Sequence, residues 1–419
     1  FAELLAGGAP YDTARQQVRL GSFFTSNSVG LTASRGRWAY AGTVGFSEEM
    51  QRLTSALETT ADLVVAGPPV RNDLRWARGR YYAQPGLSYK TEAWSTSLDL
   101  PLSYYHFTAT DAPLGAGQRL HALVAEPNLS VRRELGALWN ASVGAGLNNR
   151  FGDIAQVNYA YILRDYRTVQ RNDAPLPRSQ GASVNAGLYY KNPLKSLFFN
   201  ASYSLSRTQS NRLYSNAVDA NGALTTVALD RNNRALTHTV LGSVSQFISP
   251  WKTNLSLQLT GSARTQPQVL NDVLVQTRVR YGRASVKASV SAFDWGSLDY
   301  RAALTALRSA VAGAPAQPLA LLQNHHAAVG VFPVGRHQLS LAADYYASQG
   351  PAPTVRAAFA DLTYRYTLPT KRKIDLEAQW SNIFNTRQYQ YSYVSQFLLA
   401  QSTYELRPAQ VLASVRLSL

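Results

Sequence analysis

The 419-residue sequence contains no cysteine, only one methionine and no uninterrupted apolar run of the length that a membrane-spanning helix needs, about 20 residues. The missing run excludes helical membrane spans. The missing cysteine is typical of proteins exported through an oxidising compartment, although it also occurs by chance. The six histidines show no His-x-x-x-His or Glu-x-x-His spacing, so we predict no metal site and no cofactor.

Signatures of catalysis and of nucleic-acid binding are missing as well. Serine is abundant, but no nucleophile-elbow glycine pattern accompanies it, so we expect no catalytic residues and no enzyme. The net charge of +16 would suit a nucleic-acid-binding protein, yet the basic residues are scattered and no zinc spacing is present. We interpret the charge as basic loops and a basic lumen near anionic lipid headgroups, and we expect no nucleic-acid partner.

Most of the chain alternates apolar and polar residues, which is the period of a β-strand with two different surroundings. The pattern is clear at 98–104, 139–147, 197–206, 255–264, 273–281, 284–292 and 374–380. Strands of roughly 9–13 residues fit a tilted membrane crossing, whereas soluble sandwich strands usually have about five or six. We predict an all-β fold, a transmembrane antiparallel β-barrel of roughly 16–22 strands over residues 1–419, in the bacterial outer membrane.

Short and long connections are expected to alternate, as periplasmic turns and extracellular loops do in such barrels. We place short turns at 35–37, 133–135, 191–195, 248–251, 333–336 and 368–371, and a further turn at 281–283. We place long connections at 61–80, 109–120, 151–179, 209–234 and 306–323. Residues 297–323 are rich in Ala and Leu and could hold a short helix, and 152–167 fit either a strand or a loop helix.

The last nine residues alternate to the end of the chain, and their apolar face carries Val411, Ala413, Val415, Leu417 and Leu419. Lipid does not tolerate an open strand edge, because its backbone groups would have no partner. We therefore predict that this strand closes the barrel by pairing with the first strand.

Alternation also predicts which side chains face the lumen and which meet the membrane interface. The lumen-facing charges are expected to be Arg264, Arg278, Arg280, Lys287, Arg365, Asp375 and Glu377, with Asp344 and Asp361. On the lipid face each Arg or Lys would cost about 2–4 kcal/mol near the midplane. These charges fit either a lattice of ion pairs or a basic path for an anionic ligand. Interfacial girdle positions are expected for Trp38, Trp94, Trp139, Trp251 and Trp380.

The C-terminal block resembles the barrel of TonB-dependent receptors, in the form common in Bacteroidetes. Residues 375–386, DLEAQWSNIFNT, resemble that family's strand ending in Asn-(Leu/Ile)-Phe-Asn. Residues 404–411, YELRPAQV, are similar to its Tyr-x-Leu-Arg-Pro-Arg-Gln approach to the last strand. Ala409 replaces the commoner Arg, and Leu419 replaces the usual terminal Phe. The resemblance covers residues 375–419.

This resemblance implies a receptor that takes up a bulky nutrient such as a siderophore, an oligosaccharide or a peptide. It also implies TonB as a partner, reached through a plug domain that is not present in this chain, so we expect the chain to be the C-terminal part of a longer receptor. Outer-membrane lipid or lipopolysaccharide and other outer-membrane or periplasmic proteins are further expected partners. Two alternatives remain open: a structural barrel that anchors partner proteins, and a passive porin-like channel.

Overall fold

The computed structural model describes residues 13–59, 70–165, 168–172, 174–218, 224–333, 335–350, 353–369, 374–394 and 399–417. These residues form 23 strands and two short 3-10 turns, η1 (Ile154–Gln156) and η2 (Ser249–Trp251). Nowhere in the described ranges is there a helix with the length and apolar character of a membrane span. The all-β prediction is confirmed, and the 21 strands of the large sheet fall within the predicted number.

The strands are bounded as follows. The first half contains β1 (Ala14–Arg35), β2 (Trp38–Thr59), β3 (Arg71–Lys90), β4 (Trp94–Asp99), β5 (Leu102–Asp111), β6 (Ala116–Ala125), β7 (Asn128–Glu134), β8 (Trp139–Phe151), β9 (Ile162–Asp165), β10 (Thr168–Arg171) and β11 (Arg178–Asn192). The second half contains β12 (Leu197–Val218), β13 (Leu224–Ile248), β14 (Thr253–Leu270), β15 (Val273–Phe293), β16 (Gly296–Val311), β17 (Ala320–Val331), β18 (His337–Gln349), β19 (Val355–Thr367), β20 (Ile374–Ser381), β21 (Gln388–Val394), β22 (Leu399–Glu405) and β23 (Gln410–Leu417).

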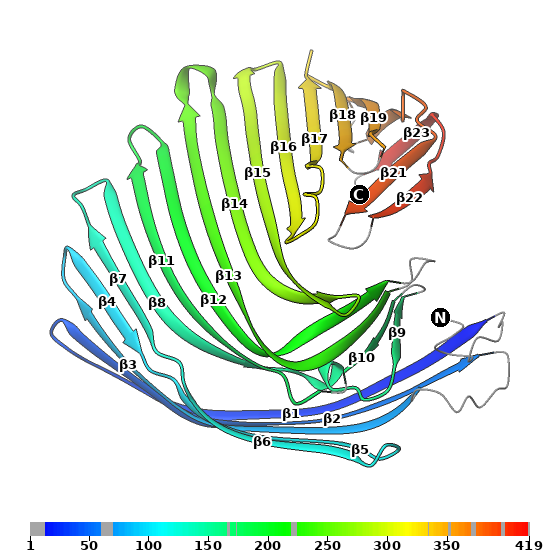
Figure 1. Cartoon of the computed structure of the whole chain (residues 1–419). Coiled ribbons are helices and arrows are strands. Elements are labelled where there is room, and N and C mark those ends of the chain that lie inside the picture. Colours follow the sequence, from blue (N-terminus) through cyan, green and yellow to red (C-terminus); the bar gives the residue numbers. More distant parts are fainter. Residues whose placement is uncertain are drawn as a thin grey trace.

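Neighbouring strands pair as antiparallel hairpins, and the sheet curves strongly along its length (Figure 1). Parallel contacts are limited to short stretches between β10 and β13 and between β12 and β14. The edge strands are β1, which pairs with β2, and β23, which pairs with β20. The described residues contain no pairing between β1 and β23, so barrel closure by Val411, Ala413, Val415 and Leu417 stays a prediction. Leu419 lies outside the described residues.

Prolines interrupt the sheet at one level in neighbouring strands. Pro101 separates β4 from β5, and Pro127 separates β6 from β7. Because proline has no N–H to donate, each contributes only its carbonyl: Glu126 N donates to Pro101 O (2.9 Å), and Leu147 N donates to Pro127 O (3.0 Å). Beyond this level β6 pairs with β5 alone, whereas β7 pairs with β8. The β5–β6 hairpin therefore leaves the main sheet next to residues 152–177.

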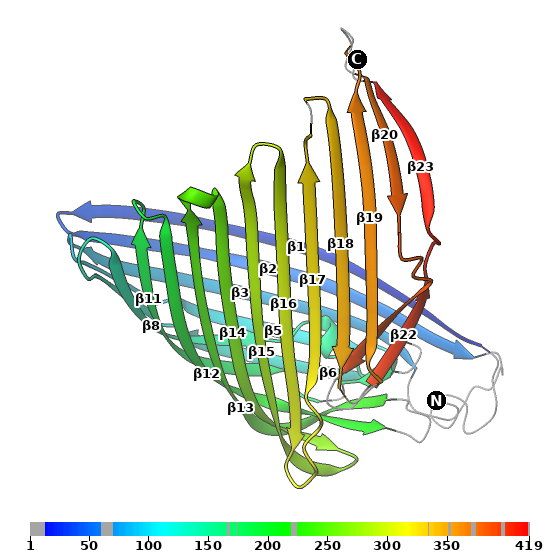
Figure 2. The same ribbon diagram turned by 90° about the horizontal axis from the view of Figure 1, so that it is seen from above.

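Tight turns lie along one edge of the sheet, as Figure 2 shows. The predicted short turn at 35–37 is confirmed, with Gly36 at φ 61°, and the one at 248–251 is confirmed as η2. The long connection at 109–120 is wrong, because β5 and β6 fill most of it. In the same way β12 and β13 occupy much of 209–234, and β3 begins within 61–80. These strands extend well past the expected membrane crossing.

Two further expectations about local structure are wrong. Residues 297–311 belong to β16, which is paired on both sides, so cross-strand pairing overrides the helix propensity of Ala and Leu. Residues 281–283 lie inside the continuous strand β15, where Gly282 pairs with Gly261 and Ala306. The apolar residues change phase there because the two halves of β15 have different surroundings, without any reversal of the chain.

The two C-terminal motifs meet at a bend shared by β20–β21 and β22–β23. Asn382 and Asn385 adopt left-handed φ values of 50° and 51°, a conformation that Asn tolerates better than most residues. Asn382 Nδ2 donates to the carbonyl oxygens of Thr386 (2.9 Å) and Arg407 (2.9 Å), and Ala409 N donates to Asn385 Oδ1 (3.1 Å). The bend directs the β21–β22 hairpin across the sheet, so Tyr389 packs on Phe359 of β19 (ring centroids 6.3 Å apart).

We expect Asn382→Ala to loosen the β21–β22 hairpin, because it removes the three side-chain hydrogen bonds, including the one that Asn382 Oδ1 accepts from Thr386 N, and disfavours positive φ. The expected loss is about 1–3 kcal/mol of local stability. Asn382→Gly, which keeps the backbone conformation, should lose less. The rate of tryptic cleavage at Arg387 and Arg407 in the folded protein measures the effect. Gln379→Ala, on the adjacent β20, is the control, and equal cleavage in all variants would contradict this role of Asn382.

Candidate functional site

The strand register assigns each residue to one of two faces, because residues directly opposite each other in an antiparallel pair point to the same side. We call inward the face that contacts residues 152–177, and outward the opposite face. From β2 to β23 the outward face carries the apolar half of each alternation. Its large side chains are exposed, for example Val143 (55%), Leu259 (50%) and Val415 (64%). Water surrounds such a continuous apolar surface only at a large free-energy cost.

Aromatic residues border this apolar belt at the edge with the short turns. Trp38 packs on Tyr89 and Trp139 packs on Tyr190, each with ring centroids 4.7 Å apart, and all four lie on the outward face. Trp94 lies at the same edge with its ring under the Arg133 guanidinium. These are positions predicted for the girdle. Trp251 lies in η2, and Trp380 lies on the outward face close to the bend at Asn382.

Tyr–His pairs recur on the outward face: two lie well along their strands from the short turns, and two lie nearer to the turns at 294–295 and 335–336. Each pair is diagonal across two neighbouring strands, and the tyrosine hydroxyl lies within hydrogen-bond distance of histidine Nδ1. The pairs are Tyr104–His121 (3.0 Å), Tyr203–His238 (2.8 Å), Tyr300–His325 (2.8 Å) and Tyr364–His337 (2.6 Å). Tyr and His rings are partly apolar and carry one polar end, so they suit the boundary between the apolar belt and water.

Ion pairs and hydrogen bonds join many charges of the inward face. Arg365 Nη2 lies 2.8 Å from Glu377 Oε2, Asp375 accepts a hydrogen bond from Thr367 Oγ1 (2.7 Å), and His326 Nδ1 lies 2.8 Å from Asp344 Oδ1. The register also places Arg264, Lys287 and Asp361 on this face. A lumen role for these residues stays a prediction.

Arg278 and Arg280 do not share a face with Lys287, which corrects the prediction made for them. A turn at 281–283 would have reversed the direction of the chain. The strands on its two sides could then have kept Arg278, Arg280 and Lys287 on one face. In the continuous strand β15, even-numbered residues pair with the outward residues of β14 and β16: Arg280 faces Ala263 and Arg308. Both arginines lie outward: Arg280 is level with His238 through Ala263, and Arg278 is level with Leu236 through Thr265.

The described residues between 152 and 177 form an insert that packs on the inward face of β2, β3 and β5. Its apolar core includes Trp76 and Phe107 of the sheet with Ile154, Val157 and Ile162 of the insert, all buried. Polar contacts fix its position. Asn72 Oδ1 accepts from Ala160 N (2.8 Å), and the Gln16 amide bonds to both backbone groups of Leu163 (2.6 and 2.8 Å). Burial of this apolar surface is what holds the insert.

Arg212 of β12 anchors the other side of the insert. Its buried guanidinium donates to the carbonyl oxygens of Gln156, Ala174 (3.0 Å) and Pro175. Burial lowers the pKa of Arg212, and the nearby Tyr214 opposes that shift. The guanidinium replaces several water contacts with carbonyl contacts, which is how a buried cation without a bound carboxylate is accommodated.

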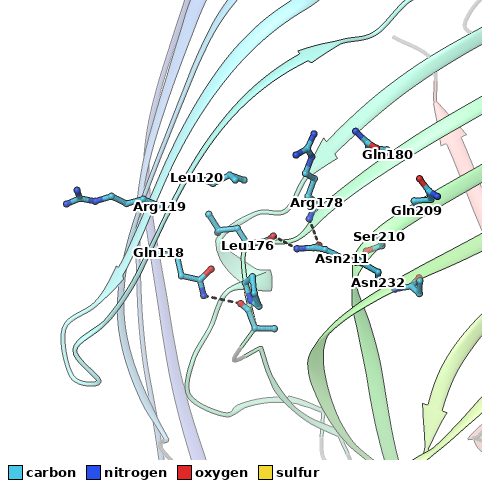
Figure 3. A pocket seen from close by; sticks show the side chains of 13 residues that line it. Gln118, Arg119, Leu120, Leu176, Arg178, Gln180, Gln209, Ser210, Asn211 and Asn232 are labelled. Atoms are coloured by element: carbon cyan, nitrogen blue, oxygen red, sulfur yellow. Dashed lines mark hydrogen bonds between the residues drawn. The ribbon is translucent and has the colours of Figure 1, made fainter.

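A polar pocket of about 1080 Å³ lies between β6, the insert and the far parts of β11–β13. Gln118 Nε2 donates to Ala174 O (3.0 Å), and Asn211 Nδ2 donates to Leu176 O (3.0 Å) (Figure 3). These two amides therefore hold the insert residues that line the pocket. The further lining side chains include Arg178, Gln180, Gln209 and Asn232. Figure 3 shows Arg119 pointing away from this space.

The sequence did not single out these pocket residues. In the sequence, these residues look like ordinary polar positions of strands: Gln118, Gln180 and Gln209. They come together only because the sheet is interrupted at Pro101 and Pro127 and the insert lies beside it. The long connection at 151–179 was the one available signal, since long loops commonly carry function.

No protein-family model and no curated protein matches the chain. Similar solved structures include an outer membrane transporter from Escherichia coli (9% identity, 94% of this chain and 75% of that chain, TM-score 0.28). Others are the ferric yersiniabactin uptake receptor from Yersinia pestis (11%, 97% and 80%, 0.30) and the ferric-catecholate import receptor from E. coli K12 (10%, 96% and 80%, 0.30). Such low identities and TM-scores leave the functional argument to the side chains of this chain.

We expect Arg212→Lys to release the insert, because a lysine cannot donate to three separated carbonyl oxygens through a planar fork. The expected change is about 2–3 kcal/mol in local opening. Hydrogen–deuterium exchange of residues 153–165 measures it. Arg264→Lys, the same change at an exposed position, is the control. Unchanged exchange in Arg212→Lys would show that the apolar core alone holds the insert.

Proposed function

We propose that this chain is the barrel of an outer-membrane uptake receptor of the TonB-dependent type. The observation that carries the proposal is the outward apolar belt, which continues from β2 to β23 and has Trp–Tyr pairs along its border at the short turns. An antiparallel sheet satisfies its backbone groups within itself, which is what hydrocarbon requires. The strands also alternate outward apolar with inward polar residues, as transmembrane barrels do.

The insert and the polar pocket support uptake of a specific ligand over free diffusion. The insert packs on the inward face, and the pocket beside it is lined by amides and one half-buried guanidinium, Arg178. Two of the amides, those of Gln180 and Gln209, belong to the outward face by register. Amide groups donate and accept hydrogen bonds, which suits hydroxyl-rich or peptide-like ligands, and Arg178 suits an anionic group on them. The nutrient in this proposal is bulky: a siderophore, an oligosaccharide or a peptide. The proposal assigns no catalytic residue.

The TonB-dependent mechanism rests on the resemblance of residues 375–386 and 404–411. In the structure these two motifs contact each other at the bend of the C-terminal strands, so both sequences serve one local arrangement. In this mechanism a plug domain transmits energy from TonB.

We expect Leu259→Arg to disrupt membrane insertion, because a guanidinium on the outward face within the belt is costly, by about 2–4 kcal/mol at the midplane and less toward the border. Gln258→Arg is the matched control, since it makes the same addition one residue away on the inward face, between Ser243 and Ser285. The measurement is the fraction of heat-modifiable, folded protein in isolated outer membranes. Equal insertion of the two variants would refute the membrane assignment.

Ligand transport separates the receptor from its two alternatives. We expect cells that express the full receptor to accumulate at least one labelled ferric siderophore, oligosaccharide or peptide, and to lose that accumulation when TonB is deleted. Accumulation without TonB, together with steady KCl conductance in a planar bilayer, would indicate a passive channel instead. Stoichiometric copurification of partner proteins without any uptake would indicate a scaffold.

A further inference from the structure

An apolar groove of about 600 Å³ lies on the outward face across β7, β8 and β11–β13. Leu129, Leu147, Val184, Leu205 and Leu236 line it. The small residues between them, Ala145, Gly146 and Ala182, leave the surface hollow at this level. The groove is therefore a local depression within the apolar belt. Farther from the short turns on the same face, Gln180 and Gln209 of the polar pocket follow its Ala182 and Arg207.

Two arginines form one end of this groove. Arg207 pairs with Leu236, and Arg234 pairs with Gln209, so the two arginines are diagonal neighbours on β12 and β13. Diagonal side chains of this kind lie within about 7–8 Å of each other, close enough for both guanidinium groups to contact one phosphate group. Both side chains are exposed.

The same surface continues with further positive charge. Arg278 lies opposite Thr265, the outward neighbour of Leu236, and Arg280 lies directly opposite Arg308. Like charges directly opposite each other destabilise a sheet. None of these five arginines forms an ion pair within the described part of the chain. The register places no Asp or Glu among their outward neighbours from β12 to β16. This part of the outward face thus lacks the carboxylates that would balance the positive charge of the five arginines.

We propose that this groove is a binding site for a phosphorylated lipid of the outer leaflet. Its acyl chain fills the apolar groove, and its phosphate group is held by Arg207 and Arg234, with Arg278, Arg280 and Arg308 extending the site to neighbouring headgroups. Two features of the surface specify this occupant. The groove is apolar and faces the lipid side of the belt, and the arginines lie at its end farther from the short turns, beyond Tyr203 and His238. Guanidinium groups bind phosphate through paired N–H donors.

The inference rests on the proposed membrane orientation, in which the far ends of the strands are extracellular. It deepens that proposal, because a bound lipid would fix the depth and tilt of the barrel at β12–β13. It also accounts for the outward position of Arg278 and Arg280, which an alternating lumen pattern does not explain.

The test uses the full protein in phosphatidylcholine nanodiscs that contain a defined amount of diphosphorylated lipid A, with binding measured by native mass spectrometry. Arg207→Gln/Arg234→Gln should weaken binding about thirtyfold, since each arginine near an anionic lipid contributes about fivefold. Arg264→Gln/Arg283→Gln is the matched control, because it removes two exposed arginines from the inward face of β14 and β15. The control should bind within about twofold of the unmodified protein.

A third variant tests the groove separately from the charge. Ala182→Phe fills the hollow and should weaken lipid binding while all arginines remain. Competition with inorganic phosphate distinguishes a lipid site from a simple anion site. Displacement of the lipid by phosphate at equal concentration would overturn the proposal, and so would binding unaffected by Arg207→Gln/Arg234→Gln. If Leu259→Arg inserts normally, the membrane assignment itself fails. If it does not, and the arginine variants still bind lipid, only this site fails.

Discussion

The antiparallel hydrogen-bond ladder between neighbouring strands is the interaction on which both faces of the molecule depend. Once two strands are paired in register, each side chain is committed to the outward or the inward face. A slip of one residue between β14 and β15 would bring Lys287 and Ser289 to the outward face in place of Val286 and Ala288. Because an apolar belt tolerates such charges poorly, the sequence of each strand specifies its register as well as its existence.

The interior is organised where this ladder is interrupted. The prolines at 101 and 127 remove ladder donors, and the β5–β6 hairpin separates from β8 beyond them. The insert fills the resulting space, with Asn172 Nδ2 bonded to Asn158 Oδ1 (2.7 Å) inside it and Arg212 outside it. At the other end of the chain, Asn382 and Asn385 interrupt the ladder a second time and turn the β21–β22 hairpin across β19. In both places, a few prolines or asparagines interrupt the regular strand pairing and so create the irregular part of the fold.

The alternation in the sequence was sufficient to predict an all-β antiparallel protein and the outward direction of residues such as Leu255, Leu257 and Leu259. The alternation was not sufficient where helix propensity and strand pairing favour different structures. Residues 297–311 have helix-forming composition but lie between two strands that already offer backbone partners. The polar pocket could not be predicted from the sequence for another reason. Gln118 and Gln209 are 91 positions apart in the sequence. They line one pocket only because the insert and the interruption of the sheet at Pro101 and Pro127 bring their strands together.

Arg280 shows why an alternating pattern must be interpreted together with position along the strand. The same face of β15 carries Val286 and Ala284 near the short turn and Arg280 and Arg278 farther along, with no change in pairing. A barrel wall has a single outward direction but two outward surroundings, hydrocarbon at mid-height and headgroups with water above it. Charge on the outward face is costly in the first and favourable in the second. In the proposed membrane orientation, the phase change at Gly282 therefore marks the height at which the wall leaves the hydrocarbon. The Tyr203–His238 pair lies at this level of the sheet, because His238 pairs with Ala263 beside Arg280.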